Sequence, residues 1–363
     1  MNRIKVGLFT SFGILLMIGC NDDPPSGDLL SIPYDPRPQN VIVPAFFNPF
    51  PDNPSNPLTY DGVQLGRHLF YDPILSSDSS MACAGCHKPE FAFTDGEAFS
   101  IGVTGQLGNR SSMSLLNVAY FSKGLFWDGR SADLESQALE PVENPIELHE
   151  SWPNVEMKLR RHVKYPEMFR KAFGISGKAE IKKELAAKAL AQFQRTLITG
   201  GNSRYAKQLE GKTFFDPDEQ EGMEMFFNSN PSLPDAQCGH CHAFPTFQSS
   251  DYFNNGLDAA SKVSDFKDVG RGAISGIPLD SGRFKATSLF NWHLTAPYMH
   301  DGRFKTIEEV LDHYTQQVKQ SPNLDPNVAN LVLNVRQKNK VLAFLKTLID
   351  TSYLKNQDFL SPF

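Results

Sequence analysis

Two short segments of this 363-residue chain combine cysteine and histidine at one spacing. Each segment has two cysteines three positions apart and a histidine directly after the second cysteine. The sequences are CAGCH at residues 83–87 and CGHCH at residues 238–242. This C-x-x-C-H arrangement attaches a c-type haem through two thioether bonds and supplies a histidine ligand to its iron. The chemistry that it predicts is electron transfer or redox catalysis.

The motifs use four of the five cysteines and two histidines: Cys83, Cys86 and His87, then Cys238, Cys241 and His242. A single motif could instead be a redox dithiol or half of a zinc site, and four cysteines could form two disulfides in an exported protein. The recurrence of the complete pentapeptide favours two covalently bound haems c and no disulfide. The 28 Phe, 10 Tyr and 3 Trp residues would pack well against planar cofactors.

A second pattern follows each haem motif. Residues 114–117 (SLLN) lead to residues 126–130 (FWDGR), and residues 288–291 (SLFN) lead to residues 299–303 (MHDGR). The second copy is longer between its haem motif and this pattern, and we place the extra residues within the stretch 254–282, which is interrupted by Gly and Ser. The repetition predicts a duplicated haem domain whose insertion lies near a haem edge.

Apolar residues at helical spacing predict a mainly α fold with long loops. One stripe ends at the TGGN sequence of residues 199–202, which indicates a helix stop and a domain boundary. A further helix is expected to open at Asp216-Pro217. The prediction is two cytochrome c-like domains, residues 58–200 and 201–363, each with one covalently bound haem. The two stripes are Ile181, Leu185, Ala189, Phe193 and Leu197, and Val341, Leu342, Leu345, Leu348 and Ile349.

Residues 1–20 are interpreted as an export signal. Arg3 and Lys5 precede an apolar run that is too short to span a bilayer. The ending MIGC resembles the lipobox of bacterial lipoproteins, in which Cys20 would be acylated; an ordinary cleaved signal is the alternative. Both interpretations predict an exported, periplasmic protein, and in the first it contacts a membrane only through a lipid on Cys20. Residues 21–57 hold ten of the 25 prolines, so we expect an extended tether or wrapping arm outside the core.

Size and charge set broad limits. The length indicates two domains, and 41 acidic against 35 basic side chains give a net charge of −6. With a pI of about 5.9, this balance argues against a nucleic-acid partner.

Several segments, in order along the chain, resemble the bacterial dihaem cytochrome c peroxidases and their relatives, the methylamine-utilisation (MauG-like) dihaem enzymes. Besides the haem motifs they are residues 65–70 (LGRHLF), 100–102 (SIG), 126–130 and 295–298 (TAPY). The resemblance covers about residues 58–350. It implies that the haem held by His87 reacts with hydrogen peroxide. The haem held by His242 would relay electrons to it from a small c-type cytochrome or cupredoxin.

The resemblance also assigns roles to three other side chains. It implies that Trp127 lies on the electron path between the haems, that Glu147 is the distal acid–base and that Gln137 is a distal amide. Peroxide cleavage independently requires a proton carrier, and an apolar pocket raises a carboxyl pKa into a useful range. On the residues alone, a solvated Glu147, a core Trp127 and a surface Gln137 remain the alternatives.

Two positions depart from the peroxidase pattern. A His that blocks the first haem in many such peroxidases is matched here by Val103, which cannot ligate iron, so this haem should be open to peroxide in the ferric state. The usual Met ligand of the second haem is matched by Tyr314. On an expected helix over residues 306–318, Tyr314 points inward. We favour Tyr314 as the sixth ligand and keep Met299 as the alternative.

Three functions follow from these features. The first is a peroxidase, the second is an oxidase that uses peroxide to oxidise a protein or small molecule, and the third is a plain dihaem electron carrier. The resemblance further implies a calcium ion between the domains near Thr295 and Pro297, although Ser111 replaces the expected Asn. It also allows a homodimer.

Overall fold

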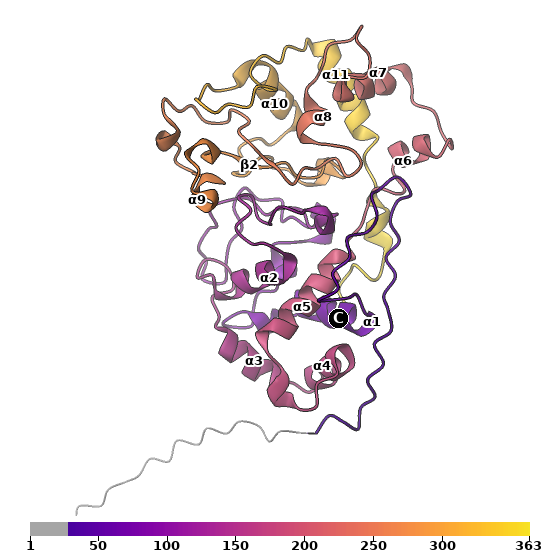
Figure 1. Ribbon diagram of the computed structural model, residues 1–363, viewed down its shortest axis with the longest axis vertical. Coiled ribbons are helices and arrows are strands. Elements are labelled where there is room, and N and C mark those ends of the chain that lie inside the picture. Colours follow the sequence, from indigo (N-terminus) through magenta and orange to yellow (C-terminus); the bar gives the residue numbers. More distant parts are fainter. Residues whose placement is uncertain (1–27) are drawn as a thin grey trace, which may run out of the picture.

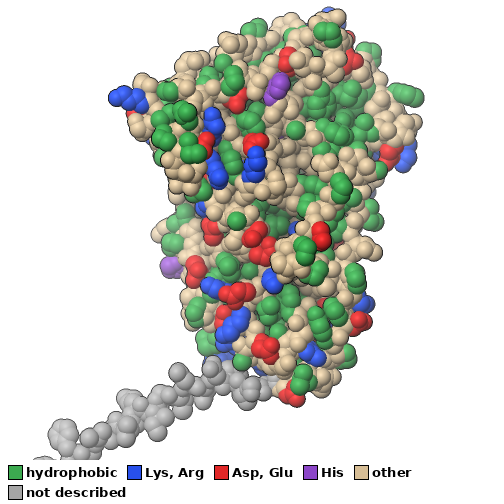
Figure 2. Space-filling view, viewed as in Figure 1, with side chains coloured by type: hydrophobic (Ala, Val, Ile, Leu, Met, Phe, Trp, Pro, Cys, Tyr) green, Lys and Arg blue, Asp and Glu red, His purple; other side chains and the backbone are tan. Residues whose placement is uncertain are grey.

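The computed structural model describes residues 28–363, and the expected signal segment with Cys20 lies outside them. The described chain is mainly helical and forms two halves, the N-terminal one below the C-terminal one in Figure 1. On the face seen in Figure 2, acidic and basic side chains are mixed on both halves. Within residues 28–363, no helix combines the length and the apolar character needed to cross a bilayer.

Two crossing helices form the centre of the N-terminal half, α1 (Tyr60–Tyr71) and α5 (Lys183–Arg195). Helix α2 (Leu134–Glu143) packs on α5, and α4 (Tyr165–Phe173) packs on α1, with α3 (Trp152–Arg161) beside α4. The buried core of this half includes Leu65, Phe70 and Phe193.

The C-terminal half has a similar centre, formed by α7 (Pro217–Phe227) and α11 (Val335–Lys346). Around it lie α6 (Arg204–Leu209), α8 (Cys238–Cys241), α9 (Gly272–Ser275) and α10 (Ile307–Asp312). Two short strands, β1 (Tyr252–Phe253) and β2 (Phe284–Lys285), pair antiparallel with Tyr252 opposite Lys285. Phe226, Phe247 and Phe344 are buried in the core of this half.

The start of α7 confirms the helix expected at Asp216-Pro217. The Asp216 side chain accepts a hydrogen bond from the Glu219 N–H at 2.9 Å, and the Glu219 side chain accepts one from the Asp216 N–H at 2.9 Å. Such a capping box satisfies backbone donors that the first turn leaves free, and a cap is worth about 1 kcal/mol. The two apolar stripes correspond in part to α5 and α11, since Ile181 and Leu197 lie outside α5 and Leu348 and Ile349 lie beyond the end of α11.

Glycine allows close contact at both helix crossings. A Cβ added at Gly66 of α1 would overlap the Ala189 carbonyl oxygen of α5. A Cβ added at Gly222 of α7 would overlap the Lys340 carbonyl oxygen of α11 in the same way. Backbone-to-backbone packing of this kind requires a residue without a side chain, so the two halves use the same solution at equivalent places.

Both ends of the described chain cross between the halves. Leu29 is buried in the N-terminal core and Phe47 in the C-terminal core. The expectation that residues 21–57 lie outside the core was therefore wrong at these two positions, because an apolar side chain in an extended arm can be buried wherever the arm passes. The described part of this segment does form a wrapping arm, which was one of the two arrangements expected from its prolines. The C-terminal end of the chain crosses back to the N-terminal half, where Tyr353 and Phe359 belong to the core.

The helix expected over residues 306–318 is divided. Helix α10 ends at Asp312, and a π-helical turn follows over His313–Gln317. A π turn shifts the positions of the side chains that follow it and is frequent at functional sites. Tyr314 lies within this turn.

Candidate functional site

The first haem motif forms a 3-10 turn over Cys83–Gly85, and its two cysteines and His87 line one cavity. His87 Nδ1 lies 2.8 Å from the Phe93 carbonyl oxygen. A proton on Nδ1 leaves Nε2 free to ligate a metal. Burial lowers the pKa of His87, which favours the neutral imidazole that a metal requires. Ser112 Oγ fixes the motif further by donating to the Cys86 carbonyl oxygen at 2.6 Å.

The cavity beside His87 has a volume of about 1130 Å³. Its walls are largely apolar, and within the described residues Cys83, Cys86, Cys238 and Cys241 are not joined in disulfides. Room for a large planar group, two thiols and an available imidazole fit a covalently attached haem. Apolar wall residues include Phe70, Leu75, Leu115, Val118 and Leu134.

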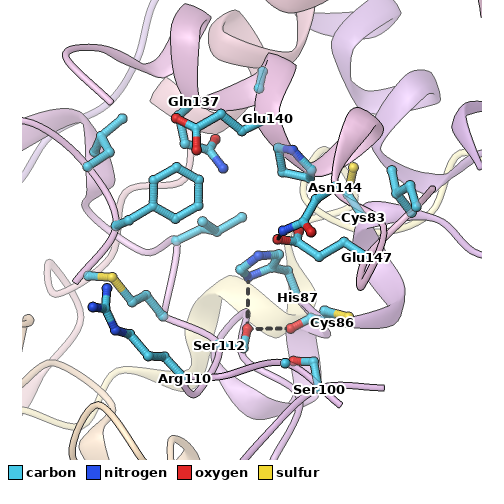
Figure 3. A pocket seen from close by; sticks show the side chains of 18 of the residues that line it. Cys83, Cys86, His87, Ser100, Arg110, Ser112, Gln137, Glu140, Asn144 and Glu147 are labelled. Carbon is cyan, nitrogen blue, oxygen red and sulfur yellow. Dashed lines mark hydrogen bonds between the residues drawn. The ribbon is translucent and has the colours of Figure 1, made fainter. Parts of the chain in front are cut away.

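Polar side chains lie across this cavity from His87 (Figure 3). Gln137 and Glu140 are one turn apart on α2, and Asn144 and Glu147 follow the end of that helix. The helix thus places a carboxyl and an amide on one face, and the loop after it adds a second carboxyl and a second amide.

Glu147 is held by a tight turn over residues 144–147. The Glu147 N–H donates to the Asn144 carbonyl oxygen at 3.0 Å, and Asn144 Nδ2 donates to Glu147 Oε1 at 2.7 Å. Pro145 at the second position of the turn favours this geometry. Burial raises the pKa of the Glu147 carboxyl although the Asn144 hydrogen bond and Arg130 act to lower it.

The loop that contains Val103 packs directly on this turn. The Val103 N–H donates to the Glu147 carbonyl oxygen at 2.8 Å. Gly102 is needed for this approach, because a Cβ there would overlap the Ile146 carbonyl oxygen. The SIG sequence therefore supports the backbone that carries Glu147.

Glu140 is a cavity residue for which no role was predicted. Arg130 Nε donates to Glu140 Oε2 at 2.8 Å, and the Ser131 hydroxyl also donates to this carboxylate. The Arg130 guanidinium carbon lies 3.4 Å from the centre of the Phe126 ring. Helical spacing from Gln137 was the sequence signal that could have indicated Glu140.

The second haem motif occupies helix α8 and the residue after it. His242 Nδ1 lies 2.9 Å from the Thr287 carbonyl oxygen, so Nε2 is again available for a metal. Tyr314 and Met299 converge on Asn255, whose Nδ2 lies 3.3 Å from Tyr314 Oη and 3.5 Å from Met299 Sδ. Burial raises the pKa of the Tyr314 phenol, and its environment includes Cys238 and Cys241. Both candidate ligands thus lie together near the second motif.

Trp127 lies where the two halves meet. Its side chain lines the cavity beside His87, and its Nε1–H donates to the Ser111 carbonyl oxygen at 2.8 Å. Ser111 in turn donates from Oγ to the Met299 carbonyl oxygen at 2.8 Å and from N–H to the His300 carbonyl oxygen at 2.8 Å. Trp127 is therefore linked to the segment that carries Met299.

The Ser111 and Thr295 hydroxyls, which are expected near a calcium ion, each donate one hydrogen bond. The Ser111 hydroxyl donates to Met299, and the Thr295 hydroxyl donates to the Trp292 carbonyl oxygen at 2.9 Å. Residues 28–363 contain no cluster of three or more His, Cys, Asp or Glu side chains that could hold a metal ion. Calcium between the domains stays a prediction, and we assign it no role in the chemistry.

The sequence matches known dihaem proteins over most of its length. A model of the family described as di-haem cytochrome c peroxidase matches residues 60–214. The chain is 33% identical to methylamine utilization protein MauG of Methylorubrum extorquens over 300 residues, which cover 82% of this chain and 81% of that protein. It is also 33% identical to cytochrome c551 peroxidase of Nitrosomonas europaea over 293 residues, which cover 80% and 81% of the two chains.

This chain belongs to the di-haem cytochrome c peroxidase family. A crystal structure of a MauG-like protein associated with microbial copper homeostasis is 32% identical, with a TM-score of 0.77, and the match covers 89% of this chain and 99% of that one. The diheme peroxidase BthA of Burkholderia thailandensis is 21% identical with a TM-score of 0.69, over 91% of this chain and 94% of BthA, and shares the fold. Family membership agrees with the resemblance seen in the sequence and makes the chain an oxidoreductase of the peroxidase type.

Within this family member, the structure gathers the expected residues into two groups. Cys83, Cys86, His87, Trp127, Gln137 and Glu147 line the first cavity. Cys238, Cys241 and His242 form the second motif, and Tyr314 lies in the environment of its two cysteines. The residues expected in the insertion also reach the first cavity, since Lys267 and Asp268 line it.

Proposed function

We propose that this protein is a dihaem peroxidase that reduces hydrogen peroxide to water with electrons from an external donor. The observation that carries the proposal is the half-buried carboxyl of Glu147, with a raised pKa, in the same cavity as His87. A plain electron carrier needs no acid–base group beside its iron. This arrangement therefore favours catalysis over simple electron transport.

Haems covalently bound at the two motifs would supply one-electron redox chemistry and an iron to which peroxide can bind. Glu147 would accept a proton from the near peroxide oxygen and deliver it to the departing oxygen. Asn144 keeps the carboxylate in place for this transfer, and Gln137 offers an amide to the same space. Two electrons and two protons then convert one peroxide into two water molecules.

The proposed electron route starts at the C-terminal haem, held by Cys238, Cys241 and His242. It passes Trp127 and ends at the haem held by Cys83, Cys86 and His87. The donor that we propose is a small c-type cytochrome or a cupredoxin. The net charge of −6 would help to steer a basic partner toward the protein.

We further propose Tyr314 as the sixth ligand of the C-terminal haem. Its support is the placement of the Tyr314 hydroxyl beside Asn255, in the environment of Cys238 and Cys241. Met299 reaches the same Asn255 and is the alternative ligand. A phenolate ligand would lower the haem potential, whereas a thioether would raise it.

Three organisational features belong to the same proposal. The equivalent glycine contacts of the two helix pairs support domain duplication, with domains over residues 58–200 and 201–363. The N-terminal sequence supports export and a lipid on Cys20. Labelling with a radioactive fatty acid tests this point, and an unlabelled mature protein would leave only a free periplasmic form.

A second function is favoured by specific residues. Val103 stands where many peroxidases have a blocking His, and Tyr314 stands where they have Met. Both features suit an enzyme of the MauG type that stores two oxidising equivalents and uses peroxide to oxidise a protein or small molecule. Relatives with either name match the chain about equally well.

The deciding experiment starts from fully ferric protein that lacks residues 1–20. Peroxide and a reduced small c-type cytochrome are added, and donor oxidation is followed together with the haem spectra. Sustained donor consumption without prior reduction is the expected result. A long-lived oxidised spectrum without donor consumption would support the oxidase instead, and no reaction with peroxide would leave only the carrier.

A further inference from the structure

The turn that carries Trp127 receives hydrogen bonds from the C-terminal half at three consecutive carbonyl oxygens. The Lys285 N–H donates to the Trp127 oxygen at 2.9 Å. Arg271 Nη1 donates to the Asp128 and Gly129 oxygens, each at 3.2 Å. Every backbone acceptor of this Trp-Asp-Gly segment is thus bound across the boundary between the halves.

The same turn is also held through the Asp128 carboxylate. Asp128 is 6% exposed, and Arg110 Nη1 donates to its Oδ2 at 2.6 Å. Arg110 makes two further bonds to Asp268, from Nε at 2.8 Å and from Nη2 at 2.7 Å. A planar guanidinium held by two carboxylates in this way has little freedom to move. Asp268 therefore fixes Arg110, and Arg110 fixes Asp128.

Asp268 and Arg271 both come from the stretch 254–282, the insertion that distinguishes the second copy of the repeat. Its segment around α9 lies beside the boundary between the halves in Figure 1. Gly129 makes room for this contact, because a Cβ there would lie 2.8 Å from Arg271 Nη1 and would also overlap the hydroxyl of Tyr252, just before the insertion. The extra residues are thus packed against the Trp127 turn and do not form a free surface loop at this point.

We propose that the insertion is a clamp that positions Trp127 for electron transfer between the two halves, with Asp268 and Arg271 as its positioning residues. The inference rests on the proposed relay role of Trp127. Electron transfer depends on the distance and orientation of the groups that carry it, just as catalysis depends on the positioning of reacting groups, where a displacement of about 1 Å can cost up to about a hundredfold in rate. A turn fastened at its backbone and at its carboxylate would keep the indole in place.

The test uses the holoprotein with both haems. Asp268→Asn removes one carboxylate from Arg110, and Arg271→Gln removes the two bonds to the turn. Asp268→Glu is the conservative variant. Asp265→Asn is the matched control, because Asp265 lies in the same insertion and bonds only within its own short turn. Two quantities are measured: hydrogen exchange of the peptide covering residues 122–132, and the rate of electron redistribution between the haems after injection of one electron.

We expect Asp268→Asn and Arg271→Gln to increase exchange in this peptide and to slow electron redistribution about tenfold, with unchanged spectra of both haems. Asp268→Glu should recover most of the rate. The clamp is overturned if Asp268→Asn matches Asp265→Asn in both quantities. Trp127→Phe separates the two proposals. A normal electron-transfer rate in that variant would reject the relay role of Trp127. The clamp would then be decided only by hydrogen exchange of residues 122–132 in the Asp268→Asn and Arg271→Gln variants.

Discussion

At the Glu147 carboxyl, burial and hydrogen bonding act on the pKa in opposite directions. Desolvation raises the pKa above its ordinary 4.5, and the bond from Asn144 offsets part of this increase. A raised carboxyl pKa means that ionised Glu147 lowers the stability of the folded state as the pH rises above 4.5. The protein tolerates this cost at a position where a proton carrier is needed.

Glu147→Gln removes the proton carrier and keeps the shape of the side chain. The rate of reaction with peroxide should fall by about a hundredfold or more, while both haem spectra remain the same. The acid limb of the pH–rate profile, expected above pH 4.5 in the parent protein, should disappear. At pH 7, unfolding should occur at the same or a higher temperature, because the cost of the ionised carboxyl is gone.

Glu150→Gln is the control for this variant. Glu150 lies in the same loop, but its side chain pairs with Lys158 at 2.7 Å and is not among those that line the cavity. The Glu150→Gln variant should react with peroxide at the same rate as the parent protein. Full peroxide turnover by Glu147→Gln would remove Glu147 from the mechanism.

The sixth ligand of the second haem gives a paired residue-scale prediction. Tyr314→Phe should change the spectrum of one haem only and raise its potential, since a phenolate ligand is lost. Met299→Leu should leave both spectra unchanged, although its side chain contacts the same Asn255. A redox titration of both variants, followed by optical spectroscopy, measures the spectra and the potentials of the two haems. The reverse result would assign the ligand to Met299.

At the scale of elements, the two helix crossings should fail independently. Gly222→Ala forces a methyl group against the Lys340 carbonyl, and Gly66→Ala does the same against Ala189. Overpacking of this kind costs about 1–3 kcal/mol. Each variant should destabilise its own half, measured by thermal unfolding followed at the two haem spectra. Gly201→Ala is the control, because a Cβ there comes no closer than 3.5 Å to Pro44; equal losses in all three variants would contradict the packing argument.

The elements that the sequence predicts well are those whose signals are local. Asp216, Pro217 and Glu219 specify the start of α7 within four residues, and the i, i+4 stripes identify α5 and α11. Strands β1 and β2 have two residues each, so they contain no period that a sequence could reveal. The π turn at Tyr314 was also missed, since its pattern is close to that of an α-helix.

The residues of the site likewise divide into those that a local sequence pattern predicts and those that it does not. The C-x-x-C-H spacing predicts both haem attachment segments, because all of its chemistry lies within five residues. The bond between Arg110 and Asp268 joins residues separated by 158 positions, and nothing in the sequence near either residue indicates the other. Glu147 needed the resemblance to a known family to be distinguished from Glu140, Glu143 and Glu150.

At the scale of the whole molecule, the two halves are held together by chain crossings as well as by contacts around Trp127. The final residues return to the N-terminal half (Figure 1), where Tyr353 and Phe359 are buried in its core. Tyr353 Oη donates to the Pro89 carbonyl oxygen at 2.8 Å, close to the end of the first haem motif. The C-terminal segment thus contributes to the surroundings of the N-terminal haem.

Deletion of residues 351–363 should therefore destabilise the half that lies far from it in sequence. Burial of a Tyr and a Phe is worth about 1.5–3 kcal/mol each, so the His87 site should unfold at a clearly lower temperature while the His242 site changes less. Thermal unfolding recorded separately at the two haem spectra measures this difference. Deletion of residues 361–363 is the control, because it keeps Tyr353 and Phe359 in place. An equal decrease at both haems would mean that the segment supports the molecule as one unit, contrary to the contacts that tie it to the N-terminal core.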